Sequence, residues 1–148
     1  MKTLKIEWGE IQAGCKAIAE SLKNKNVKTV FGIARGGIVP ASLIARYLNA
    51  DLVTVTAKSY NENNEREELY ISPTDLNTFQ GKNIVFVDDI CDSGHTLDAF
   101  LQIAKARFDD RDIYTAAVLY KSNTVHTPDF YYKQITTGEW IVFPWETE

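Results

Sequence analysis

This sequence of 148 residues has little of what membrane, zinc-binding and disulfide-rich proteins need. No apolar run approaches the roughly 20 residues that a membrane-spanning helix requires. Its two cysteines, Cys15 and Cys91, are too few for a disulfide framework, and with two histidines the common zinc spacings are absent. The sequence therefore predicts reduced, structural cysteines and no membrane partner.

Positive charge is also scarce, since 16 lysines and arginines face 20 acidic residues and the net charge is −4. Proteins that bind nucleic acids usually show a basic patch, so we expect no nucleic-acid partner. The N-terminal stretch Met1–Glu10 has Lys2 but no apolar segment behind it, unlike a secretory signal. We therefore expect a cytoplasmic protein in which any bound phosphate is held locally.

The apolar pattern alternates between strands and helices over a length that suits one domain, residues 1–148. The predicted strands are 27–33, 52–57, 84–87 and 113–120, and the predicted helices are 11–24, 39–48 and 96–108. Such alternation is typical of an α/β fold with a central, mostly parallel sheet flanked by helices. Residues 10–121 would form this core.

Two segments lack a helical period. Ser59–Glu68 is polar and charged, which predicts a mobile loop. Asp129–Trp145 is rich in aromatic and β-branched residues and predicts short antiparallel strands that cap one edge of the sheet. A small C-terminal hood of short strands, residues 122–148, would result.

The most informative segment is Val85–Leu97, in which an apolar strand leads through Asp88-Asp89 and a short loop into a helix. Open α/β sheets bind ligands beyond the carboxyl ends of their strands. Asp92-Ser93-Gly94-His95-Thr96 supplies backbone N–H groups, hydroxyls and a glycine at a helix N-terminus, as a phosphate site requires. In the simpler alternative, Asp92 or Ser93 only caps the helix.

Neighbouring carboxylates at Asp88 and Asp89 repel each other and lose solvation unless a cation or hydrogen-bond donors compensate them. A diol, a metal ion, or both would do so. A second candidate phosphate loop, Ala34-Arg35-Gly36-Gly37, follows the first strand and combines one cation with two glycines. A tight turn between strand and helix would explain this loop equally well.

With these residues, Val85–Leu97 resembles the phosphoribosyl-pyrophosphate motif of the type I phosphoribosyltransferases, whose fold is Rossmann-like. The resemblance implies that Asp88 and Asp89 face the ribose hydroxyls and a magnesium ion. It further implies that Asp92 accepts a proton from the purine base. The phosphoribosyl-binding residues would be Asp88, Asp89, Asp92, Ser93, Gly94, His95 and Thr96, with His95 contributing only its backbone.

The resemblance extends to the bacterial xanthine-guanine branch of this family, from Trp8 to Trp145. It implies that Ala34, Arg35, Gly36 and Gly37 bind pyrophosphate, with a cis peptide bond between Ala34 and Arg35. Ser59 and Tyr60 would begin a lid over the pyrophosphate. Lys121, Trp140 and Ile141 would bind the base.

The implied reaction is purine salvage, in which ribose 5-phosphate passes from phosphoribosyl pyrophosphate to guanine, xanthine or hypoxanthine. Relatives form homodimers or homotetramers, so we expect an oligomer. Two alternatives remain open: an enzyme that acts on another base, and a regulator that binds phosphoribosyl pyrophosphate without turnover. We expect His126 to be structural.

Overall fold

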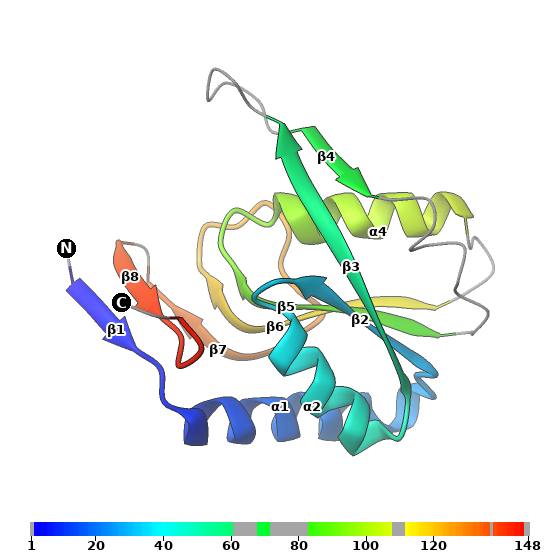
Figure 1. Cartoon of the computed structure of the whole chain (residues 1–148), viewed down its shortest axis with the longest axis horizontal. Helices are drawn as coiled ribbons and strands as arrows, with labels where there is room; N and C mark the ends of the chain where they lie inside the picture. Colours follow the sequence, from blue (N-terminus) through cyan, green and yellow to red (C-terminus); the bar gives the residue numbers. More distant parts are fainter. Residues whose placement is uncertain (1, 61–67, 72–82, 108–111, 137, 147–148) are drawn as a thin grey trace.

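The computed structural model describes residues 2–60, 68–71, 83–107, 112–136 and 138–146. Within these residues the centre of the molecule is a six-stranded sheet with the order β4-β3-β2-β5-β6-β7 (Figure 1). Its strands are β2 (Thr29–Ala34), β3 (Asp51–Tyr60), β4 (Glu68–Ile71), β5 (Ile84–Cys91), β6 (Ile113–Lys121) and β7 (Phe130–Ile135). Every neighbouring pair is parallel except β3 and β4.

Helices cover both faces of this sheet. Helices α1 (Trp8–Leu22) and α2 (Ile38–Leu48) lie on one face, and α4 (His95–Arg107) lies on the other (Figure 1). A short 3-10 helix, Lys23–Lys25, follows α1. The predicted α/β fold is thus confirmed. Among the described residues, no helix is both long and apolar enough to cross a membrane.

Strand β5 holds the two layers together because its first four residues are buried and alternate between two cores. Val85 and Val87 belong to the core beneath α1 and α2. Ile84 and Phe86 belong to the core beneath α4. Successive side chains of a strand point to opposite faces, so a continuous apolar run is what a strand covered on both sides needs.

Aromatic packing fills the core beneath α4. Phe31 on β2 stacks on Phe86 with 5.0 Å between ring centroids. Phe86 also packs on Phe100 of α4 at 5.3 Å. All three side chains are fully buried, so the start of α4 is fixed relative to β5 by an aromatic ladder.

The C-terminal third contains the predicted short strands, but their direction differs from our expectation. β7 runs parallel to β6 and completes the main sheet. β8 (Glu139–Val142) pairs in parallel with β1 (Lys2–Lys5) and forms a separate two-stranded sheet beside the N-terminus (Figure 1). The expectation of antiparallel strands was wrong because aromatic and β-branched composition indicates a strand but not its partner.

The prediction of a loop over Ser59–Glu68 is also partly wrong. β3 continues to Tyr60, and its end pairs antiparallel with β4, where Tyr60 lies opposite Glu68. Backbone pairing therefore extends a strand into a polar segment that has no apolar period. Residues 61–67 of this predicted loop lie outside the described residues.

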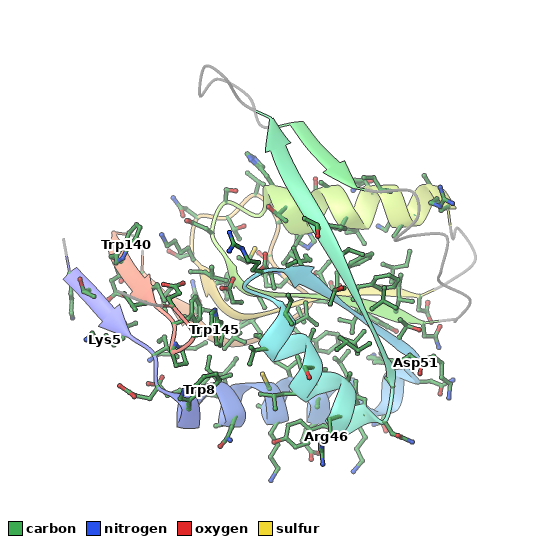
Figure 2. The ribbon with its side chains drawn as sticks, in the orientation of Figure 1. Lys5, Trp8, Arg46, Asp51, Trp140 and Trp145 are labelled. Atoms are coloured by element: carbon green, nitrogen blue, oxygen red, sulfur yellow. The ribbon has the colours of Figure 1, made fainter. Side chains whose placement is uncertain are left out.

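Tryptophans join the two-stranded sheet to α1. Trp145 stacks on Phe143 with 4.9 Å between ring centroids, and it meets Trp8 at 5.9 Å. Figure 2 shows Trp8 at the start of α1 and Trp145 close to it. The helix begins at Trp8, earlier than predicted, because the preceding Glu7 has the extended conformation of an N-cap.

We predict that Phe86→Ala destabilises the protein by about 3 to 5 kcal/mol, because the substitution leaves a cavity between two aromatic neighbours in a closed core. Urea unfolding measures this change. Tyr47→Ala, at a helix position that is 49% exposed, is the control and should shift the free energy of unfolding by no more than about 0.5 kcal/mol. Equal effects of the two substitutions would contradict the core assignment.

Candidate active site

Because β2, β5 and β6 are parallel neighbours, their carboxyl ends lie side by side at one end of the sheet. Asp88 and Asp89 lie within β5, which continues to Cys91 and so extends beyond its predicted end at Val87. The backbone N–H of Asp89 donates to Asp88 Oδ1 at 2.8 Å, and that of Ile90 donates to Asp89 Oδ1 at 2.7 Å. Both carboxylates are half-buried and adjacent.

The charged forms of these two carboxyl groups are destabilised by their surroundings. Burial raises the pKa of Asp88 well above its usual range, and the charge of Asp89 raises it further. Burial likewise raises the pKa of Asp89. Such a pair favours a ligand that supplies positive charge or hydroxyl donors.

The loop of residues 91–95, which contains most of the first candidate phosphate site and is called the phosphate loop below, connects β5 to α4. Gly94 adopts a φ of +90°, a conformation that side chains other than glycine rarely allow. The N–H of His95 donates to Ser93 Oγ at 3.3 Å, and the helix then starts with Asp98 N–H donating to Gly94 O at 3.0 Å. The first backbone N–H groups of α4, which have no partner within the helix, therefore lie next to this loop.

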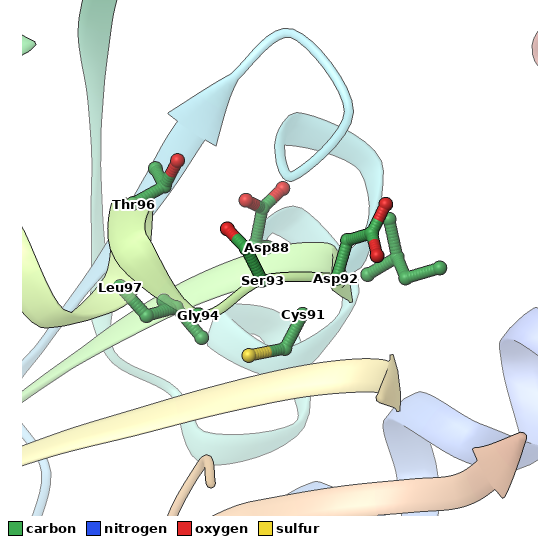
Figure 3. A pocket seen from close by; sticks show the side chains of 8 residues that line it. Asp88, Cys91, Asp92, Ser93, Gly94, Thr96 and Leu97 are labelled. Atoms are coloured by element: carbon green, nitrogen blue, oxygen red, sulfur yellow. The ribbon is translucent and has the colours of Figure 1, made fainter. Parts of the chain in front are cut away.

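A pocket of about 80 Å³ opens at this loop. In Figure 3 the side-chain oxygens of Asp88, Ser93 and Thr96 point to one side of the loop, whereas Cys91 Sγ points to the other. The lining residues are Asp88, Ile90, Cys91, Asp92, Ser93, Gly94, Thr96 and Leu97. The structure thus brings together the predicted phosphoribosyl residues except the side chain of exposed His95 and that of Asp89, which lines a neighbouring pocket.

The second glycine-containing loop lies directly against β5. The Ala34–Arg35 peptide bond is cis, as the family resemblance implied. A Cβ atom placed on Gly36 would collide with the Asp89 carboxylate, and one placed on Gly37 would collide with Val87 O. Both glycines are therefore required for this close approach, while the Arg35 side chain is exposed.

A larger pocket of about 200 Å³ lies on the other side of Asp92. Lys121, at the end of β6, forms an ion pair with Asp92, with 3.2 Å between Nζ and Oδ1. Lys121 is 18% exposed and Asp92 is 66% exposed. The lining residues are Asp89, Ile90, Asp92, Lys121, Glu139, Trp140, Ile141, Phe143 and Glu146.

The three predicted base-contacting residues, Lys121, Trp140 and Ile141, thus lie around one pocket. Sequence reasoning missed Glu139 and Glu146, which line the same pocket. Their only signal was their position on either side of the aromatic segment. Trp140 is 61% exposed, so its ring is accessible to a ligand (Figure 2).

The remaining predictions concern the lid, the cysteines and His126. Only the backbone of Ser59 and Tyr60 is described, and residues 61–67 of the predicted lid lie outside the described residues. Both cysteines are buried, and burial raises the pKa of Cys15 to about 12. His126 bonds to Thr115 through Nε2 at 2.9 Å, which agrees with a structural role.

Magnesium fits the donor set at Asp88 and Asp89. The described residues contain no group of three or more histidine, cysteine or acidic side chains that could enclose a metal ion. Magnesium does not require one, since it is often held by one or two carboxylates together with water and substrate oxygens. Two half-buried carboxylates with raised pKa values are suitable ligands of this kind.

Comparison with known proteins agrees with this geometry. The chain is 32% identical to a xanthine-guanine phosphoribosyltransferase of Desulfotalea psychrophila, covering 99% of this chain and 88% of the relative. It is 30% identical to the Cereibacter sphaeroides protein of the same name, covering 98% and 87%. A purine phosphoribosyltransferase structure from Pyrococcus horikoshii aligns with a TM-score of 0.83 and 29% identity, covering 100% of this chain and 97% of that one.

A xanthine-guanine-hypoxanthine phosphoribosyltransferase structure from Helicobacter pylori shares the fold, with a TM-score of 0.81 at 20% identity, covering 97% and 93%. Residues 7–148 match the family described as the phosphoribosyl transferase domain. With a match over nearly its whole length and the expected loops at one sheet edge, this chain belongs to the phosphoribosyltransferase family.

Proposed function

We propose that this protein transfers ribose 5-phosphate from phosphoribosyl pyrophosphate to N9 of a 6-oxopurine and releases pyrophosphate. One observation carries the proposal: Asp92 lines both the phosphate-loop pocket and the pocket that contains Lys121 and Trp140. A donor in the first pocket and a base in the second would therefore meet beside a carboxylate. Holding two reactants in this way is a major source of catalysis.

The donor half uses the two glycine-containing loops. Backbone N–H groups at the start of α4, with the hydroxyls of Ser93 and Thr96, bind the 5-phosphate. Asp88 and Asp89 bind the ribose hydroxyls, which can donate to carboxylates. The exposed Arg35 side chain, held on a loop that touches β5, binds the leaving pyrophosphate.

Asp88 and Asp89 would hold a magnesium ion together with substrate oxygens, and the bound ion would supply positive charge to the diphosphate leaving group. The protein's own contribution at this point is to keep both carboxylates at the edge of the pocket. Gly36 makes this possible, because any larger residue would displace the Asp89 carboxylate.

The acceptor half positions the purine and moves its proton. Lys121 donates a hydrogen bond to the exocyclic oxygen at C6 of the base, and Trp140 stacks on the ring. Ile141 contributes backbone groups. Asp92 accepts the proton from N7 as N9 attacks the ribose carbon, and general-base catalysis of this kind contributes about 10²- to 10⁴-fold.

Three further features stay predictions. They are a lid that begins at Ser59 and Tyr60, assembly into a homodimer or homotetramer, and a cytoplasmic location.

The assay that tests the proposed function measures pyrophosphate release from phosphoribosyl pyrophosphate with guanine, xanthine, hypoxanthine, adenine or uracil present. We expect turnover with at least one 6-oxopurine and none with uracil. Tight donor binding without turnover on any base would instead indicate a regulator.

Asp92→Asn should lower kcat by about 10²- to 10⁴-fold, because the amide cannot accept the N7 proton. The Kd of phosphoribosyl pyrophosphate should change little, because the backbone of the phosphate loop is retained. Steady-state kinetics and donor titration measure the two effects. Asp98→Asn, on α4 outside both pockets, is the matched control and should keep wild-type kcat. If the kcat of Asp92→Asn were close to the wild-type value, Asp92 would not be the general base.

Lys121→Ala should raise KM for guanine by roughly 10- to 100-fold, since the loss of a hydrogen bond from a charged donor costs about 1.5 to 3 kcal/mol. KM for the donor should change much less. Lys133→Ala on β7 is the control, because Lys133 lies outside the pocket. If Lys121→Ala left the preference among purines and KM for guanine unaltered, the assignment of the base pocket would be wrong.

A further inference from the structure

The connection between β6 and β7, residues 122–129, lies against the phosphate loop and contributes no residue to the lining of its pocket. The N–H of Val125 donates to Ser93 O at 2.8 Å. The thiol of Cys91 donates to His126 O at 3.2 Å. These bonds join segments more than 30 positions apart in the sequence, so the shape of the phosphate loop depends on the connection.

The contact at Gly94 is the closest. A Cβ atom placed on Gly94 would collide with Thr124 Oγ1 and would lie 2.7 Å from His126 N. Gly94 thus lines the ligand pocket and also lies directly against Thr124 and His126. Movement of this connection would move the backbone that surrounds the pocket.

Thr124 fixes the connection through its hydroxyl group. Thr124 Oγ1 donates to His126 O at 2.9 Å and accepts the N–H of His126 at 3.3 Å. The same oxygen lies 3.4 Å from Cys91 Sγ. One hydroxyl therefore closes a turn and meets the first residue of the phosphate loop.

His126 anchors that turn to the interior of β6. Its Nε2 lies 2.9 Å from Oγ1 of Thr115, which is fully buried. Thr115 Oγ1 donates to Asp129 Oδ2 at 3.4 Å and accepts the N–H of Asp129 at 3.1 Å. The donor and acceptor in the bond between Thr115 Oγ1 and His126 Nε2 depend on the tautomer of the imidazole ring. The connection is thereby tied to the rigid centre of the sheet.

We propose that Thr124 and His126 are positioning residues that hold the phosphate loop in the conformation that binds the 5-phosphate of the donor. The proposal rests on the function proposed above. A loop that is already ordered loses less conformational freedom when its ligand binds, so its affinity is higher.

The test compares Thr124→Val, which removes the hydroxyl and keeps the shape, with Thr124→Ser, which keeps the hydroxyl. Titration calorimetry gives the Kd of phosphoribosyl pyrophosphate with magnesium, and kinetics give KM for donor and guanine. Losing a hydroxyl that serves partly buried partners should raise Kd and KM for the donor about tenfold in Thr124→Val. KM for guanine should change by less than about twofold, and Thr124→Ser should restore donor binding.

Ile18→Val, in the core beneath α1 and away from both pockets, controls for a general loss of stability. If Thr124→Val leaves donor Kd unchanged, or if Ile18→Val raises it equally, Thr124 does not position the loop. Should Thr124→Val fail to fold, His126→Leu compared with His126→Gln makes the same test, since glutamine keeps a donor. Donor binding without turnover by the wild-type protein would overturn the proposed function alone, whereas no donor binding would overturn both.

Discussion

The parallel pairing of β5 with β2 and β6 is the constraint on which the rest of the site depends. Val87 lies opposite Gly32 of β2 and Ala116 of β6, so the three strands end at one edge of the sheet. That edge carries the cis peptide loop, the phosphate loop and Lys121. Because Asp88 follows the buried run of β5 directly, a shift in the register of β5 would move a carboxylate into the buried part of the sheet.

Local pattern predicted much of this arrangement. The apolar run before Asp88 indicates a doubly covered strand, and the glycines at 36, 37 and 94 indicate close approach of the backbone. Partners and directions were harder to predict. Residues 139–142 form a strand as expected, but they pair with residues 2–5, which have no strand signal of their own. Such pairing depends on contacts between the two ends of the chain, which local pattern does not contain.

The connection 122–129 illustrates the same limit inside the site. Its sequence looks like an ordinary polar turn, and His126 by itself suggested only a structural role. Its importance arises from bonds to Cys91, Ser93 and Thr115, which the fold brings close. The acceptor pocket is assembled in a similar way, with Lys121 from the main sheet and Trp140 from the two-stranded sheet. Each half of the site therefore combines one recognisable motif with support from a distant segment.

The central claim is that donor and acceptor pockets meet at Asp92. A crystal structure of the protein with guanosine 5′-monophosphate tests this claim most directly, because the nucleotide spans both pockets. The phosphate should bind at Ser93–Thr96, the purine should lie between Lys121 and Trp140, and Asp92 should lie within hydrogen-bonding distance of N7. A nucleotide bound with its base outside the pocket of Lys121 and Trp140, or with its phosphate away from the phosphate loop, would contradict the account.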